Sequence, residues 1–467
     1  MTMNSLSILG TTSDAGKTTV VMALCKIFAD QGYRVAPFKA QNVSNNSGVG
    51  EDERELARAQ YFQAEAAGVP ATYHLNPVML KSHGNGSVHI VLNGQVHKSN
   101  DVYGYYRELD GLKTHVSAAF EYLQEKYDFV IAEGAGSPVE LNLIHKDLSN
   151  TFIAEEYQTK LILVADIERG GVFASIYGTL ELLDPALRKN VIGVIVNKFR
   201  GDQRFFEEGR KIIEERFNVP VLGVVPYQAL NIDMEDSYSL QNYQQRIDTP
   251  KIKLAIIAYP SISNYNDVDP LMADPEIHVD IIQHYCPLSG FDMVVLAGSK
   301  TTIRDLQWLK HTGLFTELQQ FTGQIFGICG GYQMLFEKIC DPLGVEAKEA
   351  SEEDGLGYID DRITFAEKKI LKRQTYEAFN HTVKGYEIHM GKAAKYPLYY
   401  HQARIAGTHI HGIFDNNAFR TAWFKQINPE YIGYDYSSYR TETIQSFVDM
   451  IADNVDCEQI LQALAKE

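Results

Sequence analysis

The stretch LSILGTTSDAGKTT, residues 6–19, decides the fold of the first half of the chain. A short strand-like run leads into a loop bounded by Gly10 and Gly16, and VVMALCKIFADQG, which follows, has the period of a helix. Backbone N–H groups in such a loop and at the helix N-terminus bind a polyphosphate, so Lys17 is predicted to contact its β- and γ-phosphates and Thr18 to ligate Mg²⁺. Five residues separate the two glycines, one more than usual, and a tight turn with an incidental lysine is the alternative. The candidate nucleotide-binding residues are Thr12, Asp14, Gly16, Lys17 and Thr18.

The chain is organised as two α/β halves. Short β-branched runs alternate with turns and helical segments, which predicts a doubly wound α/β domain over residues 1–230. The polar sequence NIDMEDSYSLQNYQQRIDTP predicts a linker over residues 231–250. The alternation then restarts and predicts a second α/β domain over residues 251–467, with a solvated loop at KEASEED (residues 348–354) and a helix at the C-terminal end.

Two acidic residues end predicted strands of the first domain. Glu133 lies in VIAEGAGS (residues 130–137), and Asp166 lies in VADIERGG (residues 164–171). In an open parallel sheet, ligands bind at the carboxyl ends of the strands. Glu133 is therefore the preferred second Mg²⁺ ligand, and Asp166 ranks below it. The alternative interpretation of the segment around Glu133 is a glycine-rich turn with an exposed glutamate.

The chain is acidic, with 43 Lys and Arg against 60 Asp and Glu among 467 residues and a net charge of −17. This charge argues against a protein that binds DNA or RNA by counterion release. No signal peptide and no apolar run of about 18–20 residues is visible, and the five cysteines have no CxxC spacing. We therefore expect a cytoplasmic protein without a membrane partner or structural zinc.

The stretch QIFGICGGYQML, residues 324–335, predicts a reactive cysteine in the second domain. Small residues around Cys329, at a junction of strand and helix, allow the sharp turn that exposes a nucleophile. The backbone N–H groups of Gly330 and of Gly298, in LAGSK (residues 296–300), are candidate oxyanion donors. The alternative is a buried structural cysteine beside a Gly-Gly turn.

The candidate base lies in GTHIHGIFDN, residues 407–416. His409 and His411 are two positions apart and would share one face of a strand, so the spacing leaves both open. A third residue that orients the imidazole is not evident, since Asp415 is close only in sequence.

Taken together, these motifs resemble the cobyric acid synthases, the glutamine-dependent amidotransferases of cobalamin biosynthesis. The resemblance extends over nearly the whole chain. The phosphate loop and the cysteine elbow are shared with wider superfamilies. In contrast, QNVSNNS (residues 41–47) and ADIERGGVFAS (residues 165–175) are typical of a narrow group of proteins. The other motifs that carry it are APFKAQN, ARAQYFQAEAAGV, LNPVMLK, AEGAGSPVELNL, NKFRGD, LAGSKTTIRDLQWL, GICGGYQML and HGIFDN.

The resemblance implies an N-terminal ATP-dependent synthetase domain related to dethiobiotin synthetase, a group that shares the spacing of Gly10. It also implies a C-terminal class I glutamine amidotransferase-like domain. By analogy, Thr18 and Glu133 map onto Mg²⁺ ligands and Cys329 onto the nucleophile. The candidate corrinoid-binding residues are Gln41, Asn42, Asn45, Asn46 and Asp166.

The resemblance also selects His411 as the base, because the family's histidine directly precedes Gly-hydrophobic-Phe. Ordinary class I glutaminases carry His-Pro-Glu, with the glutamate completing a triad. Gly412 and Ile413 follow His411 here, so the expected arrangement is a Cys-His dyad.

The implied reaction is amidation of the b, d, e and g carboxylates of adenosylcobyrinic acid a,c-diamide, with ATP and glutamine as cosubstrates, through acyl phosphates. One alternative is a cobyrinic acid a,c-diamide synthase or another glutamine-dependent carboxylate ligase; QNVSNNS disfavours the diamide synthase, whose pattern here resembles PFKxGPDYxD. A non-enzymatic alternative is a nucleotide switch or partitioning ATPase with a degenerate regulatory domain. Thr12 disfavours it, because partitioning ATPases carry a signature lysine there. The sequence predicts no oligomeric state.

Overall fold

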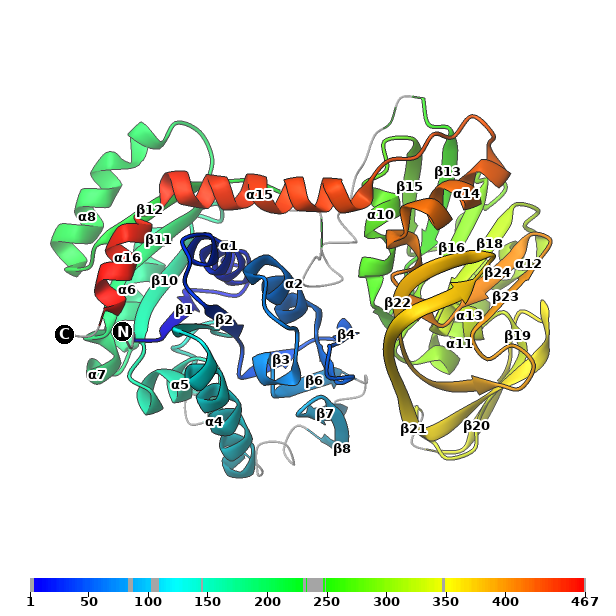
Figure 1. Cartoon of the computed structure of the whole chain (residues 1–467), viewed down its shortest axis with the longest axis horizontal. Helices are drawn as coiled ribbons and strands as arrows, with labels where there is room; N and C mark the ends of the chain where they lie inside the picture. The colour runs from blue at the N-terminus through cyan, green and yellow to red at the C-terminus, as the bar shows by residue number, and fades with distance from the viewer. Residues whose placement is uncertain are drawn as a thin grey trace. The chain divides into compact units, whose positions relative to one another are not determined.

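The computed structural model describes residues 4–82, 87–101, 109–143, 146–229, 232, 247, 249–346 and 349–465. The chain forms two compact units, and Figure 1 labels many of their helices and strands. Unit 1 comprises residues 1–43, 50–230 and 441–467, and unit 2 comprises residues 44–49 and 231–440.

A six-stranded parallel sheet with the order β12-β11-β10-β1-β9-β2 forms the centre of unit 1. The chain passes from β1 to β2 at one edge, returns through β9, and continues through β10 to β12 on the other side of β1. This reversal is the predicted doubly wound topology, and it places the loop after β1 at the switch point where open sheets bind ligands. The strands are β1 (Leu6–Gly10), β2 (Val35–Phe38), β9 (Phe129–Glu133), β10 (Lys160–Asp166), β11 (Val191–Phe199) and β12 (Val221–Pro226).

Helices cover this sheet because the central parts of its strands are apolar and buried. Every residue of β1 and of β9 is buried, as expected for parallel strands between helices. One apolar cluster joins α4 to β2 and β9, and another joins α6 and α8 to β10 and β11. The helices of unit 1 are α1 (Lys17–Asp30), α2 (Arg58–Ala67), α4 (Leu109–Lys126), α5 (Thr151–Glu156), α6 (Val172–Leu182), α7 (Pro185–Arg188), α8 (Glu207–Phe217) and α16 (Cys457–Leu464).

Unit 1 also holds a four-stranded mixed sheet with the order β3-β6-β7-β8. Its strand β3 is parallel to β6, and the remaining pairs are antiparallel. The strands are β3 (Gln41–Val43), β6 (Val78–Ser82), β7 (Ser87–Leu92) and β8 (Gln95–Asp101).

Unit 2 contains a six-stranded sheet and a five-stranded sheet. The first has the order β15-β13-β16-β18-β24-β23 and is parallel except for β23, and the second has the order β20-β19-β21-β22-β25. The strands are β13 (Ile252–Ile257), β15 (Ile277–Ile282), β16 (Met293–Leu296), β18 (Gln324–Ile328), β19 (Phe336–Asp341), β20 (Ser351–Asp354), β21 (Ile359–Ala378), β22 (His381–Ala393), β23 (Tyr399–Gln402), β24 (Ile405–Thr408) and β25 (Ile410–His411). The helices are α10 (Asp269–Met272), α11 (Thr302–Thr312), α12 (Leu314–Gln320), α13 (Gly330–Gln333) and α14 (Asn417–Ile427).

The compact units differ from the predicted domains at the C-terminal end. Instead of one helix, the chain forms α15 (Tyr436–Asn454) and α16, and residues 441–467 belong to unit 1. The N–H of Asp456 donates to the carbonyl oxygen of Leu222 at 2.8 Å. Gly223 permits this approach, because a Cβ there would lie 2.3 Å from the carbonyl oxygen of Asn454. These contacts join residues far apart in sequence, which local patterns do not show.

Three other predicted segments have different outcomes. Residues 44–49 are grouped with unit 2 and not with the first domain. Most of the predicted linker, residues 231–250, lies outside the described residues. The loop predicted for KEASEED is wrong for its second half, because Ser351–Asp354 forms β20, an edge strand paired with β19 whose residues are partly or fully exposed.

Candidate active sites

The predicted phosphate loop joins β1 to α1 in unit 1. Gly16, directly before α1, has a φ of 95°, which a side chain would strain. Nζ of Lys17 donates to the carbonyl oxygens of Thr12 at 3.0 Å and Gly136 at 3.1 Å. A Cβ on Gly10 would lie 2.7 Å from the same Nζ. The lysine therefore lies across the loop. Its ammonium group is between the loop and the segment EGAG (residues 133–136), called the EGAG turn below.

Glu133, at the end of β9, is buried and accepts hydrogen bonds at both carboxylate oxygens. Its Oε1 accepts from Oγ1 of Thr18 at 2.8 Å and from Nζ of Lys39 at 2.5 Å, and its Oε2 accepts from Nε2 of Gln63 at 2.6 Å. The structure brings together the two predicted metal ligands. It also adds Lys39, which the motif analysis did not single out although APFKAQN places this lysine directly after a strand.

Thr18 and Glu133 fit Mg²⁺ as a donor set. Both supply oxygen, and nucleotide sites commonly use one or two protein ligands together with phosphates and water. Among the described residues, no group of three or more His, Cys, Asp or Glu side chains could hold a metal ion.

Asp166 ends β10 beside two cationic side chains. Nζ of Lys198 lies 3.1 Å from its Oδ2, and Nε of Arg169 lies 3.9 Å from the same oxygen. Arg169 also pairs with Asp14 at 3.2 Å, and Lys198 donates to the carbonyl oxygen of Asp14. These shared cations group Asp166 with Asp14 of the phosphate loop.

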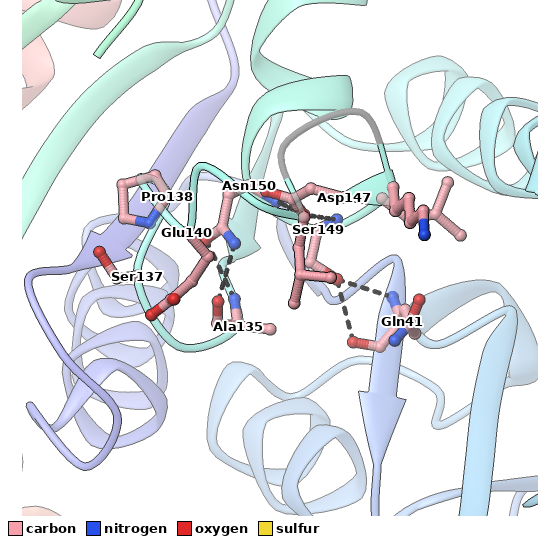
Figure 2. Close-up of a pocket in the computed structure, with 11 residues that line it drawn as sticks. Gln41, Ala135, Ser137, Pro138, Glu140, Asp147, Ser149 and Asn150 are labelled. Atoms are coloured by element: carbon pink, nitrogen blue, oxygen red, sulfur yellow. Dashed lines mark hydrogen bonds between the residues drawn. The ribbon is translucent and has the colours of Figure 1, made fainter. Parts of the chain in front are cut away.

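A cavity of about 130 Å³ lies beside the EGAG turn (Figure 2). Gln41, on β3, and Ala135 both line it, and both are fixed by hydrogen bonds (Figure 2). Ser149 Oγ accepts from the Gln41 N–H at 3.1 Å and donates to its carbonyl oxygen at 3.0 Å, while the Asn150 amide bonds both backbone groups of Ala135. Asn42 does not line this cavity; it is buried, and its amide donates to Gln60 at 2.9 Å.

Cys329 occupies the turn between β18 and α13 in unit 2, with φ 50° and ψ −106°. This is the strained strand-to-helix turn that the sequence predicts. Two glycines permit it: a Cβ on Gly331 would lie 2.0 Å from the carbonyl oxygen of Leu296, and one on Gly330 would lie 2.7 Å from a backbone nitrogen of the neighbouring strand. The Cys329 Sγ lies 3.8 Å from the carbonyl oxygen of Ile388.

The backbone nitrogen beside Gly330 belongs to Ser299 and not to Gly298. Strands β14 (Ile262–Ser263) and β17 (Gly298–Ser299) pair antiparallel, with Ser263 opposite Gly298. The N–H of Lys300 donates across this pair at 2.9 Å. Because alternate positions of an antiparallel ladder exchange hydrogen bonds, the Gly298 N–H points toward Ser263. The geometry therefore favours Ser299 over the predicted Gly298 as the second oxyanion donor.

His411, at the end of β25, is buried between Cys329 and Asp267. Its Nδ1 donates to Asp267 Oδ2 at 2.7 Å, and Asp267 Oδ1 accepts the Gly412 N–H at 2.7 Å. Its buried Nε2 has no hydrogen-bond partner among the residues that the structure describes. Burial lowers the pKa of His411, but Asp267 and Cys329 outweigh this effect and raise the pKa to about 10.

The arrangement therefore contains Asp267 in addition to the expected Cys-His dyad. Asp267 lies on η4 (Tyr265–Val268), 144 positions before His411. No motif or spacing in the sequence connects these two residues. A carboxylate so distant in sequence cannot be identified from the residues that surround His411, among them Asp415.

The neighbouring His409 has other partners. Its Nδ1 donates to the carbonyl oxygen of Pro397 at 2.9 Å, and its Nε2 lies 3.2 Å from Nε2 of Gln333. Its ring stacks on His389 with a centroid distance of 3.8 Å. Burial and His389 lower the pKa of His409 well below its ordinary value. The geometry therefore favours His411 as the base.

Asn45 and Asn46, which the resemblance assigns to the corrinoid site, belong to the segment grouped with unit 2. Asn46 is buried, and its Oδ1 accepts the N–H of Asn264 at 2.8 Å. Oδ1 of Asn45 is buried without a hydrogen-bond partner in the described part of the chain. The Asn46 acceptor is thus committed to a bond within unit 2.

Comparison with known proteins identifies both halves. Residues 6–238 match the CobQ/CobB/MinD/ParA nucleotide binding domain, and residues 253–419 match the CobB/CobQ-like glutamine amidotransferase domain. The chain is 52% identical over 462 residues to a cobyric acid synthase of Acinetobacter baylyi, with 99% of each chain covered. The chain belongs to the cobyric acid synthase family. Members from Geobacillus sp. strain WCH70 (42% identical, 96% of this chain and 94% of the relative covered) and Yersinia enterocolitica (37% identical, 98% of each) are also similar over nearly their whole length.

Membership of the cobyric acid synthase family confirms the resemblance seen in the motifs. The matched domains confirm the predicted order of a nucleotide-binding α/β domain followed by a glutamine amidotransferase domain, and with it a glutamine-dependent ligase. Within the described ranges, none of the helices is both long and apolar enough to span a membrane.

Proposed function

We propose that this member of the cobyric acid synthase family amidates the b, d, e and g carboxylates of adenosylcobyrinic acid a,c-diamide to give adenosylcobyric acid. One observation carries the proposal: two candidate sites occur in a single chain that is related over its whole length to cobyric acid synthases. The first is a phosphate loop whose Thr18 bonds the buried Glu133, and the second is formed by Cys329, His411 and Asp267. ATP and glutamine are the cosubstrates. Both are cytoplasmic metabolites, and we place the reaction in the cytoplasm.

In unit 1, the loop N–H groups and Lys17 would bind the triphosphate of ATP. A substrate carboxylate oxygen attacks the γ-phosphorus and ADP leaves, which gives an acyl phosphate. Thr18 and Glu133 would hold Mg²⁺, which neutralises phosphate charge when it is bound. Ammonia then attacks the acyl carbon, inorganic phosphate leaves, and the amide remains. The cavity lined by Gln41 would receive the corrinoid side chain that carries the carboxylate.

In unit 2, His411 Nε2 takes the proton of the Cys329 thiol, while Asp267 keeps the other imidazole proton on Nδ1 and stabilises the imidazolium. The thiolate attacks the side-chain amide carbon of glutamine, and the oxyanion faces the N–H groups of Gly330 and Ser299. His411 returns the proton to the amide nitrogen, so ammonia leaves and a γ-glutamyl thioester remains. Water then hydrolyses the thioester with His411 as base and releases glutamate.

The proposal is tested with Cys329→Ala protein assayed with glutamine and, separately, with ammonium. The a,c-diamide corrinoid is the substrate, and product mass is followed. We expect amidation from ammonium at the wild-type rate and no detectable amidation from glutamine, because only the nitrogen source is lost. Glutamine use equal to that of the wild type would exclude Cys329 as the nucleophile. Absence of corrinoid amidation by the wild-type chain from either source would exclude the proposed substrate.

A further inference from the structure

Residues 44–49, called the clamp below, contact the supports of the glutaminase residues. The chain on both sides of the clamp, up to residue 43 and from residue 50, belongs to unit 1, whereas the clamp itself belongs to unit 2. We propose that the clamp, chiefly through Asn46, positions Asp267 and His411 for glutamine hydrolysis. The inference rests on the proposed function, because it assumes that these two residues serve Cys329.

The first contact is a reciprocal pair of hydrogen bonds between the clamp and Asn264. The N–H of Asn264 donates to Oδ1 of Asn46 at 2.8 Å, and the N–H of Ser47 donates to Oδ1 of Asn264 at 2.9 Å. All three residues are buried. Asn264 has a φ of 51° and precedes η4, and its carbonyl oxygen accepts the N–H of Asp267 at 3.1 Å. The clamp therefore holds the residue that starts the turn carrying Asp267.

The second contact reaches His411 through an aromatic ring. Tyr386, on β22, lies directly opposite His411 in the pairing of β22 with β25. The two rings stack with a centroid distance of 5.0 Å and an interplanar angle of 15°. Oη of Tyr386 donates to the carbonyl oxygen of Ser47 at 3.4 Å. The tyrosine ring that covers the imidazole is thus held at its far end by the clamp.

The third contact is apolar and lies next to the nucleophile. Val49 forms a small buried cluster with Tyr386 and Ile388. The carbonyl oxygen of Ile388 is the one that lies 3.8 Å from the Cys329 Sγ. The clamp accordingly touches a neighbour of each of the three residues Cys329, His411 and Asp267.

These contacts make the clamp residues positioning residues, because none of them bonds a reacting atom. Hydrolysis requires His411 Nε2 to be aligned with the thiol, and a displacement of about 1 Å at a distance from the chemistry can cost about 100-fold in rate. The clamp continues directly from β3, which carries Gln41 of the cavity in unit 1. Glutamine turnover is therefore sensitive to a segment that continues the strand lining this cavity.

The test compares Asn46→Ala with the conservative Asn46→Asp, which keeps an oxygen for the Asn264 N–H. Asn264→Gly is a second perturbation, because glycine keeps the left-handed backbone and removes the amide bonded to Ser47. The control is Asn428→Ala, since Asn428 also bridges two backbone groups of unit 2, at 2.9 Å and 3.0 Å. Glutamate release, ammonium-dependent amidation and thermal unfolding are measured for each full-length protein.

We expect Asn46→Ala and Asn264→Gly to lower kcat for glutamate release by about 10- to 100-fold with little change in KM. Ammonium-dependent amidation by Asn264→Gly should stay within about twofold of the wild type. Asn46→Asp should recover most of kcat, and Asn428→Ala should lose stability without losing kcat. Wild-type kcat for glutamate release in both perturbed variants, or a parallel loss of the ammonium reaction in Asn264→Gly, would overturn the inference. Glutamate release is measured without corrinoid. The result therefore does not depend on whether the proposed corrinoid substrate is correct.

Discussion

Replacement of Asp267 by asparagine tests the orienting role of this carboxylate with minimal change in shape. The two oxygens of Asp267 accept from different donors, His411 Nδ1 and the Gly412 N–H, each at 2.7 Å. Asparagine has one oxygen and one NH₂ group, so it can accept from only one of them. If the asparagine oxygen accepts the Gly412 N–H, its NH₂ group faces Nδ1 of His411. Nδ1 must then accept a hydrogen bond, so the imidazole proton moves to Nε2. His411 then has no lone pair directed at the thiol.

The expected loss follows from charge and from tautomer. The pKa of His411, about 10, lies well above its ordinary value of 6.5, and this difference corresponds to roughly 5 kcal/mol. Asp267 shares this effect with Cys329 and works against burial, so removal of its charge is expected to cost roughly half, or about 30- to 150-fold in rate. The wrong tautomer costs up to about 10⁴-fold in the comparable serine protease triad. We therefore expect kcat for glutamine to fall between about 10² and 10⁴-fold.

The assay follows glutamate release and corrinoid amidation by Asp267→Asn protein, with glutamine and with ammonium. Ammonium-dependent amidation should remain at the wild-type rate, because unit 1 supplies that chemistry. The pH at which Cys329 is half-maximally alkylated by iodoacetamide should rise, because a less basic imidazole favours the thiolate less. Glutamine-dependent turnover within about threefold of the wild type would refute the reasoning and would favour a Cys-His dyad without an orienting carboxylate.

Three further predictions concern the two sites separately. Lys17→Ala should abolish amidation from glutamine and from ammonium while corrinoid binding, followed by absorbance titration, persists; ATP-dependent amidation by this variant would contradict the phosphate-loop assignment. Gly331→Ala should lower the free energy of unfolding by about 1–3 kcal/mol and abolish glutamate release, because its Cβ would lie 2.0 Å from the Leu296 carbonyl oxygen; unchanged melting and turnover would contradict this close packing. Burial raises the pKa of Asp305 to about 6, so the native state binds this proton more tightly than the unfolded chain and the contribution of Asp305 to stability falls as pH rises from about 4 to about 6. In urea unfolding across this range, Asp305→Asn should show a smaller fall than the wild type, and identical slopes would contradict the raised pKa.

The parts of the fold that local sequence encodes were predictable. A strand, a glycine-bounded loop and a helix are adjacent in residues 6–30, and the structure has β1, the loop and α1 there. The cysteine elbow was equally predictable from the sequence. Gly330 and Gly331 directly follow Cys329, and only residues without a Cβ fit those positions. In both places, the steric and conformational demands are satisfied by neighbours in the sequence.

The features that were missed depend on contacts between distant residues. Asp267 and His411 are 144 positions apart, and no periodic pattern connects an irregular turn to a two-residue strand. Val455, just before α16, forms a bridge with Gly223 of β12, and the clamp is joined to unit 2 by hydrogen bonds with Asn264 and Tyr386 and by the apolar contacts of Val49. Lys39 directly follows β2, but the role of this lysine is visible only from its bond to Glu133.

The measurement that tests the central claim most directly is the transfer of nitrogen from glutamine to the corrinoid. The wild-type chain is incubated with ATP, Mg²⁺, glutamine labelled with ¹⁵N in its side-chain amide, and adenosylcobyrinic acid a,c-diamide. The account predicts a product with four new amides, all labelled with ¹⁵N, and ADP and glutamate formed in step with them. Hydrolysis of glutamine and ATP with no labelled amide on the corrinoid would contradict it.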